Sequence, residues 1–143
     1  MEVEGVVHAL RRIHRSLTDR GSLLDLHPQP KNSTAEVWWE GRVEAVGEWD
    51  EEEDIQAIRL GRAQLALIES EGLFVTERQM EFDLLEHYPS ADDWLDHRIE
   101  EGATGFIPNE LLDKVQRLLT PAGGELIIRE PIRASLLRRL PGD

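Results

Sequence analysis

The sequence predicts a single α/β domain in which a small mixed or antiparallel sheet is flanked by helices, as in a partial three-layer fold. Apolar stripes with the helical period alternate along the chain with short segments of strand period. Hydrophobic residues make up 40% of the 143 residues and charged residues 31%, which is typical of a globular protein. No internal repeat, low-complexity tract or linker divides the chain, so we expect one domain over residues 1–143.

The expected order of elements is helix, strand, hairpin, helix, strand, two helices and strand. In numbers, these are a helix over 3–17, a strand over 22–26, a hairpin over 36–47, a helix over 52–71, one bent strand or a strand pair over 73–88, helices over 90–101 and 109–119, and a last strand over 125–137.

The first half follows from periodicity and from residues that end regular structure. Apolar residues recur at three- and four-residue intervals from Val3 to Leu17, with arginines on the other face, which indicates an amphipathic helix. Gly21 ends it. Pro28 and Pro30 cannot donate ladder hydrogen bonds, so we expect the next strand to end before them. The hairpin is expected to turn at Glu40-Gly41.

The second half follows in the same way. The helix over 52–71 has an acidic first turn, which suits the positive end of a helix dipole, and an apolar stripe that includes Ile55, Leu60 and Ile68. In the strand segment, we expect core positions for Phe74, Met80, Phe82 and Leu84. Ser90 and Pro108 are typical of the starts of the next two helices. Residues 121–124 are typical of a turn.

Charge and composition exclude several classes of function. The net charge of −13 repels phosphate backbones, so we expect no nucleic-acid partner. The chain has no cysteine, and its five histidines form no metal-binding motif, so we expect no metal site. No apolar run is long enough to span a membrane, and residues 1–10 do not have the pattern of a signal peptide. We therefore expect a cytoplasmic protein without a membrane partner.

The segment ALRRIHRSLTDRGSLLDLHP, from Ala9 to Pro28, resembles the helix and fifth strand of class I S-adenosylmethionine-dependent methyltransferases. In that family an amphipathic helix carrying R-x-L is followed by a glycine turn and an apolar strand. Arg15-Ser16-Leu17 and Gly21 occupy those places here, although Thr18-Asp19-Arg20 departs from the common Lys-Pro-Gly. The helix over 52–71, the strand in GLFVTERQMEF and the strand in GELIIREPIRASL are similar to the last helix and the antiparallel closing strands.

The resemblance covers the C-terminal half of that fold and not its cofactor-binding half. In the family, the cofactor is held by a glycine-rich loop after the first strand and by an acidic residue that ends the second. Both would lie upstream of the helix with which this sequence begins, and no G-x-G occurs in the chain. We therefore expect no catalytic residue and no cofactor for the isolated chain, and S-adenosylmethionine only if a partner completes the fold.

The same comparison predicts a partner. In the intact fold the fourth strand covers one edge of the fifth, which here is Ser22 to Leu26. An apolar edge with unpaired backbone groups favours strand pairing. We therefore expect a homodimer through the Ser22 to Leu26 edge, with a sheet that continues across the interface.

Candidate substrate-binding residues are His27, Trp38, Trp39, His87 and Tyr88. His27 follows the fifth-strand equivalent, where the loop of the resembled family faces the substrate. Trp38 and Trp39 are candidates for the wall of an apolar pocket. In the competing interpretation, one of them lies in the core and the other in an interface. Glu86-His87-Tyr88 offers an acid, an imidazole and a phenol, but neighbouring strand residues point to opposite faces and cannot all converge.

Three functions remain open from the sequence. The first is a methyltransferase-related protein that does not catalyse and acts as a dimeric binding or interaction module. The second is one part of a split methyltransferase, completed by a partner chain that supplies the missing half. The third is an unrelated small α+β ligand-binding domain with a site around His27, Trp39 and His87.

Overall fold

The computed structural model describes residues 3–120 and 123–142, which form five antiparallel strands and four helices. Their bounds are α1 (Val3–Ser16), β1 (Ser22–Pro28), β2 (Thr34–Trp39), β3 (Arg42–Glu48), α2 (Glu52–Ser70), β4 (Phe74–Tyr88), α3 (Ala91–Glu101), α4 (Asn109–Leu119) and β5 (Glu125–Arg139). The general α/β class and the order of elements are as expected. The turn expected over 121–124 includes Pro121 and Ala122, which lie outside the described residues.

The chain divides into two compact units, and the long strands β4 and β5 contribute to both. Unit 1 comprises the described residues of Met1–Pro30, Ile55–Phe82 and Ile132–Asp143. Unit 2 comprises Lys31–Asp54 and the described residues of Asp83–Pro131.

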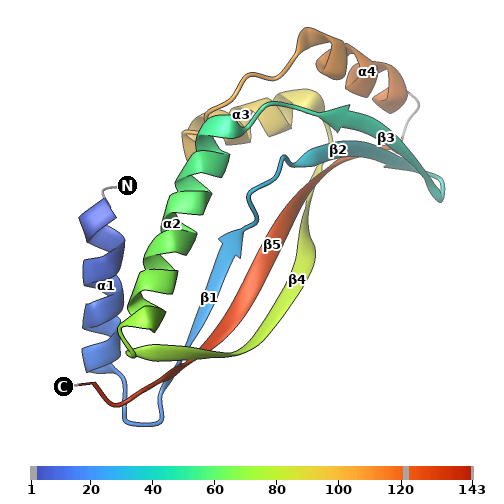
Figure 1. The fold of residues 1–143 in the computed structure, drawn as a ribbon. Helices are drawn as coiled ribbons and strands as arrows, with labels where there is room; N and C mark the ends of the chain where they lie inside the picture. The colour runs from blue at the N-terminus through green and yellow to red at the C-terminus, as the bar shows by residue number, and fades with distance from the viewer. Residues whose placement is uncertain (1–2, 121–122, 143) are drawn as a thin grey trace. The chain divides into compact units, whose positions relative to one another are not determined.

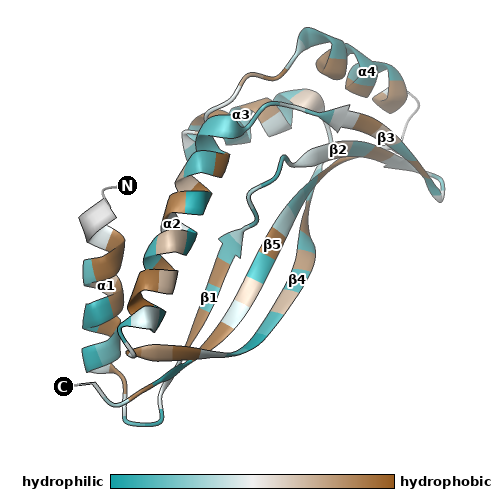
Figure 2. Ribbon diagram, viewed as in Figure 1, coloured by the Kyte–Doolittle hydropathy of each residue, from teal (hydrophilic) through white to brown (hydrophobic). Residues whose placement is uncertain are grey.

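In unit 1, β5 lies between β1 and β4 (Figure 1). The β1–β5 register runs from Ser22 opposite Arg138 to Pro28 opposite Ile132. Helices α1 and α2 lie side by side along this sheet, and their apolar and polar residues alternate (Figures 1 and 2). Apolar side chains of both helices and all three strands form the core, whose fully buried members include Ile68, Phe74 and Leu137.

The other face of this sheet is not covered by a helix of unit 1. Leu24 and Leu26 of β1 are 59% and 58% exposed. Leu23, also in β1, is partly buried and packs against the core. The alternation of side chains along a strand places the two exposed leucines on the face opposite the helices. Unit 1 therefore has two layers, not the three that we expected.

Two other expectations for buried positions were wrong. Met80 and Phe82 of β4 are 64% and 39% exposed, because the helices of unit 1 cover only one face of its sheet, and β4 contributes Phe74 to the core. Leu84, in the part of β4 that belongs to unit 2, is 43% exposed. In α2, Leu60 is 42% exposed, whereas Gln64 is buried. Hydropathy alone does not identify which side of a long strand or helix a neighbouring element will cover.

Strand β1 also runs farther than we expected. It includes His27 and Pro28. A proline is tolerated there because β1 is an edge strand and Pro28 is its last residue, where the missing backbone N–H breaks no hydrogen bond of the sheet. This extension matters for the site, since it places Asp25 and His27 two residues apart on one face of a regular strand.

In unit 2, β2 pairs with β5 and with β3, and α3 and α4 supply helical packing. The β2–β3 hairpin turns at Glu40-Gly41, as expected, with φ angles of 46° and 75°. Two positive φ angles are typical of the tight turn that matches the twist of a hairpin. The core of unit 2 centres on Trp49, Trp94 and Leu126.

Helices α3 and α4 begin as the sequence predicts. The Ser90 hydroxyl accepts a hydrogen bond from the Asp93 backbone N–H at 3.1 Å, so Ser90 caps α3. Gly102 ends the same helix in the left-handed conformation, with φ 65°. Pro108 immediately precedes α4.

Candidate functional site

Unit 1 contains a cavity of about 300 Å³ between α1, α2 and the end of β1. Most of its wall is apolar, and three polar side chains, Asp25, His27 and Arg62, complete it. The apolar lining consists of Val6, Leu10, Pro28, Ala57, Ile58, Gly61 and Leu65. An apolar cavity with a few converging polar groups is the usual form of a small-molecule site.

Asp25 and His27 form a hydrogen-bonded pair at the β1 wall of this cavity. The distance from His27 Nδ1 to Asp25 Oδ2 is 2.5 Å. Because a carboxylate accepts but does not donate, Nδ1 is the donor, and this bond fixes the orientation of the ring. The other ring nitrogen, Nε2, is buried and has no hydrogen-bond partner in the described part of the chain. When the ring is protonated, Nε2 offers a donor to a ligand.

Arg62 provides the second polar group, from the middle of α2. Its Nη2 is buried and without a hydrogen-bond partner among the described residues. Burial lowers the pKa of Arg62, the nearby charge of Arg133 lowers it further, and Glu81 opposes the change. The guanidinium remains charged, since its ordinary pKa lies far above neutrality. Arg62 as a whole is only partly buried, but a bound anion would give its buried Nη2 an acceptor and its charge a partner.

These groups define the chemistry that the cavity accepts. The lining residues of α1 and α2 favour a hydrocarbon body, and the charge of Arg62 favours an anionic head such as a carboxylate. The Asp25–His27 pair also has the arrangement of an oriented general base, but no serine, threonine or cysteine lines the cavity. The arrangement is thus better suited to binding than to nucleophilic catalysis.

The other four predicted site residues lie in unit 2, and the structure brings only some of them together. Trp38 and His87 meet edge to face, with ring centroids 5.7 Å apart. Trp38 Nε1 donates to Glu36 at 2.9 Å, and His87 Nδ1 lies 3.0 Å from Glu125 Oε2. Trp39, the last residue of β2, is partly exposed.

Tyr88 lies apart from His87, as the alternation of strand residues predicts. Its hydroxyl donates to the Glu86 carboxylate, and both side chains line a separate cavity of unit 2. Tyr88 and Glu86 therefore share one face of β4, and His87 occupies the other. The five candidate site residues therefore do not share one site, and of them His27 is the one that lines the apolar cavity of unit 1.

Asp25 and Arg62 were missed as site residues, and each carried a signal in the sequence. Asp25 lies two positions before His27 in a strand, so the two side chains share a face. Arg62 lies between Ile58 and Leu65, at helical intervals within an apolar stripe. A charged residue in such a stripe indicates a buried charge.

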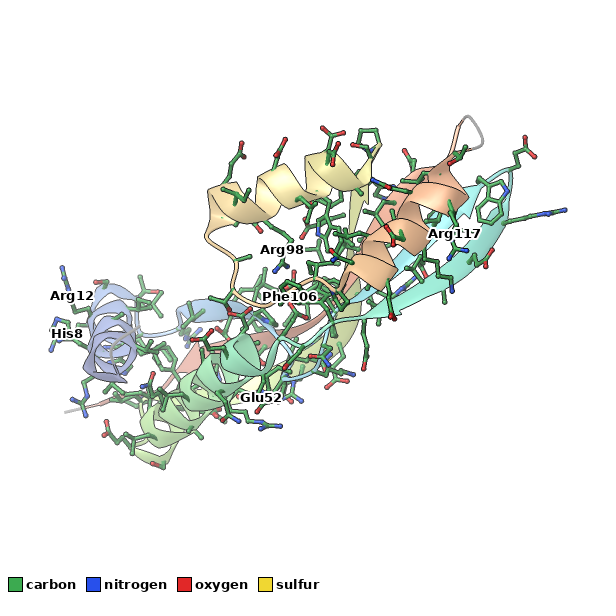
Figure 3. All side chains as sticks on the ribbon, turned by 90° about the horizontal axis from the view of Figure 1, so that it is seen from above. His8, Arg12, Glu52, Arg98, Phe106 and Arg117 are labelled. Atoms are coloured by element: carbon green, nitrogen blue, oxygen red, sulfur yellow. The ribbon has the colours of Figure 1, made fainter. Side chains whose placement is uncertain are left out.

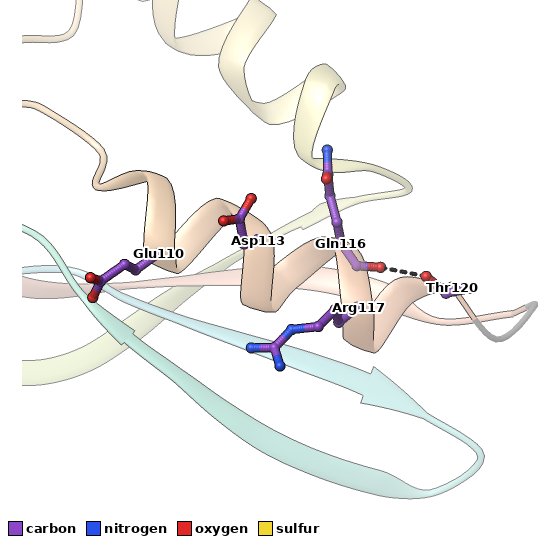
Figure 4. Close-up of a pocket in the computed structure, with 5 residues that line it drawn as sticks. All are labelled: Glu110, Asp113, Gln116, Arg117 and Thr120. Carbon is purple, nitrogen blue, oxygen red and sulfur yellow. Dashed lines mark hydrogen bonds between the residues drawn. The ribbon is translucent and has the colours of Figure 1, made fainter.

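A further hollow of unit 2 is a surface feature of α4. Its volume is about 770 Å³, and it is lined by Glu110, Asp113, Gln116, Arg117 and Thr120. All these residues belong to α4 or follow it directly, and the Thr120 hydroxyl donates to the Gln116 carbonyl at 2.8 Å (Figure 4). The lining of this hollow comes from one helix and the residue that follows it, so it does not bring together groups from different elements as a binding site usually does.

No group of three or more histidine, aspartate or glutamate side chains is arranged to hold a metal ion in the part of the chain that the structure describes. Within residues 3–120 and 123–142, no helix combines the length and the hydropathy needed to cross a membrane.

Fold and site together define a two-unit α/β protein with an amphipathic cavity beside an edge strand. No protein-family model, no curated protein and no solved structure matches the chain.

Proposed function

We propose that this protein is a binding module that does not catalyse, related to the closing part of class I methyltransferases, and that its unit 1 cavity takes a small amphipathic carboxylate. The observation that carries the ligand class is the pair of unpartnered polar atoms, His27 Nε2 and Arg62 Nη2, in a cavity whose only other polar side chain, Asp25, is already paired with His27.

The arrangement of strands supports the family relationship. The resemblance implies an antiparallel closing pair next to the fifth-strand equivalent, β1. Two ion pairs join β5 to β4, Arg138–Glu77 and Arg133–Glu81. The residue numbers fall along β5 as they rise along β4, which is the order expected for antiparallel strands. On its other side, β5 pairs with β1. This antiparallel neighbourhood of Ser22–Pro28, Glu125–Arg139 and Phe74–Tyr88 is the support that we take for the proposed relationship.

The geometry of the cavity supports binding of a carboxylate over binding of a neutral molecule. A neutral ligand would leave the Arg62 guanidinium without an anionic partner. A carboxylate would accept from Arg62 while its alkyl chain covered Leu10, Ile58 and Leu65. A hydrogen bond to a charged group contributes about 1.5–3 kcal/mol, or about ten- to hundredfold in affinity.

Calorimetric titration with hexanoate tests this proposal. We expect the wild-type protein to bind hexanoate and Arg62→Met to bind it about ten- to hundredfold more weakly, because the methionine keeps the apolar stem and removes the charge. Arg12→Met is the matched control, since Arg12 projects outward from α1 (Figure 3) and does not line the cavity. Equal affinity for hexanol and hexanoate, or an equal loss in both variants, would contradict the proposal.

Titration with S-adenosylmethionine and S-adenosylhomocysteine tests the part of the proposal that concerns the cofactor. We expect no binding by the isolated chain, because its 143 residues contain no G-x-G loop to approach the cofactor closely. Saturable binding of either compound would overturn this expectation and favour a complete methyltransferase site.

The edge of the sheet supports a second candidate, the split methyltransferase. Strand β1 pairs only with β5 among the described strands, so its other edge can accept a strand from another chain. Binding of S-adenosylmethionine that requires a second chain carrying the glycine-rich loop would establish this function. We favour a homodimer, because an edge strand can pair with its own copy across a two-fold axis without any further chain.

A further inference from the structure

Unit 2 contains a second cavity, smaller and more acidic than the first. Its volume is about 160 Å³, and it is lined by residues from the β2–α2 region, β4, α3 and β5. Five of the lining residues are carboxylates: Glu51, Asp54, Glu86, Glu101 and Glu130. Such a concentration of negative charge requires positive compensation.

Four of these carboxylates have partners within the unit. Glu51 accepts from the Ser33 backbone N–H at 2.5 Å, and Asp54 accepts from the Thr104 hydroxyl at 2.9 Å. The other two bind side chains: Glu86 accepts from the Tyr88 hydroxyl, and Glu101 lies 2.9 Å from His97 Nε2.

Glu130 differs from the other four, because it has no hydrogen bond or ion pair with another residue in the described part of the chain. Burial raises the pKa of Glu130, and the four carboxylates Glu86, Glu51, Glu101 and Asp54 raise it further. Its negative charge is therefore the least compensated in this cavity.

The one arginine in the lining is already engaged. The Arg98 guanidinium lies 5.8 Å from the ring centroids of both Trp49 and Trp94. It also donates to the carbonyls of Thr104 and Gly105, at 2.8 and 3.1 Å, in the loop that leads to Phe106 (Figure 3). Its Nη2 is thus directed at the loop and its guanidinium lies near two rings, and it forms no ion pair with Glu130 among the described residues.

Aromatic side chains form the rest of the wall and include an unused donor. Trp49, Trp94 and Tyr88 line the cavity. Trp49 is 3% exposed, and its indole Nε1 is buried without a hydrogen-bond partner in the described part of the chain. A buried indole N–H normally has an acceptor, because leaving it without one costs free energy. The cavity therefore offers a negative charge and a neutral donor.

We propose that this cavity binds a small organic ammonium that also carries an oxygen acceptor, that is, a compound of the amino alcohol class. The ammonium group pairs with Glu130 between the aromatic rings, which attract cations by their π faces. The oxygen of the ligand accepts from Trp49 Nε1. This site lies wholly within unit 2 and does not depend on the function proposed for unit 1.

The spacing of the carboxylates favours an ammonium ion over a metal ion. A divalent metal ion needs several oxygen ligands that converge at about 2.0–2.6 Å. Among the described residues, no three carboxylate or histidine side chains converge in that way. An ammonium ion needs fewer contacts and tolerates aromatic neighbours.

Calorimetric titration of the full chain with ethanolamine and choline tests the proposal. We expect saturable binding of at least one of them by the wild-type protein, and a loss of about tenfold or more in Glu130→Gln, which removes the charge and keeps the shape. Glu110→Gln is the matched control, because Glu110 lies on α4 outside this cavity.

The stability of the Glu130→Gln variant separates a binding role from a structural one. A carboxyl group whose pKa is raised in the folded state stabilises that state fully only below its unfolded pKa, and loses this contribution as the pH rises through the folded pKa. At neutral pH, Glu130→Gln should therefore raise the Tm or leave it unchanged while it weakens binding. A lower Tm would indicate that Glu130 supports the fold and would overturn the assigned role.

A second variant tests the indole donor. Trp49→Phe is expected to weaken ethanolamine binding and to leave the weaker binding of ethylamine unchanged, since ethylamine has no oxygen. Equal losses for both ligands would overturn the assignment to Trp49. Absence of binding by both amino alcohols, or tighter binding of Ca²⁺ or Mg²⁺ that Glu130→Gln abolishes, would overturn the ligand class.

Discussion

Phe74→Ala is expected to lower the free energy of unfolding by about 3–5 kcal/mol, which is typical of a buried phenylalanine replaced by alanine. Phe74 is 1% exposed and packs in the unit 1 core with Leu10, Ile68 and Leu137. Its ring also meets the ring of His14 edge to face, with centroids 5.5 Å apart. The substitution removes these contacts and leaves a cavity that the packed helices cannot fully close.

Urea denaturation monitored by circular dichroism measures this effect. The matched control is Phe106→Ala, because Phe106 is 75% exposed, and we expect its change in unfolding free energy to stay within about 0.5 kcal/mol. Similar losses for the two variants would contradict the burial of Phe74 in the core. A biphasic transition in which only one phase moves would indicate that the two units unfold separately.

The double variant Leu24→Lys and Leu26→Lys is expected to convert the proposed homodimer to a monomer without unfolding it. Both side chains are more than half exposed on edge strand β1, so lysine introduces no buried charge into the single chain. Across a two-fold axis each lysine would approach the same strand of the second copy, and four positive charges would oppose the pairing. We expect the dissociation constant to rise by about a hundredfold or more, since like charges brought together cost several kcal/mol.

Sedimentation velocity at micromolar concentration measures the association state. Met80→Lys is the control: Met80 is 64% exposed but belongs to β4, so this variant should remain as associated as the wild type. A monomeric wild-type protein at that concentration would contradict the homodimer. A dimer that Met80→Lys disrupts and the β1 variant does not would place the interface on β4 instead.

Local signals in the sequence predicted most of the helices and strands. Ser90 caps α3, Glu40-Gly41 turns the hairpin, and the apolar stripe of 3–17 forms α1. These features depend on residues that are near one another in the chain, so periodicity and turn chemistry suffice to find them.

The candidate sites were predicted less completely. His27 was identified from its position after an apolar strand, and it does line a cavity. Asp25 and Arg62 were missed, and the approach of Arg62 to His27 is not a local feature, because Arg62 reaches the cavity from α2, more than thirty positions along the chain. In unit 2, Glu130 and Trp49 come together only because β5 and the segment after β3 fold against the same helices.

By itself, the sequence determined the element types, their order and the excess of negative charge, because these depend on local geometry and composition. Only the tertiary structure decided which apolar residues are buried and which polar groups lack partners. Met80 is exposed and Gln64 is buried because one face of the unit 1 sheet carries helices and the other does not. The proposed binding function depends on the unpaired atoms of His27 and Arg62. These two residues line one cavity only because β1 and α2 pack together in the folded chain.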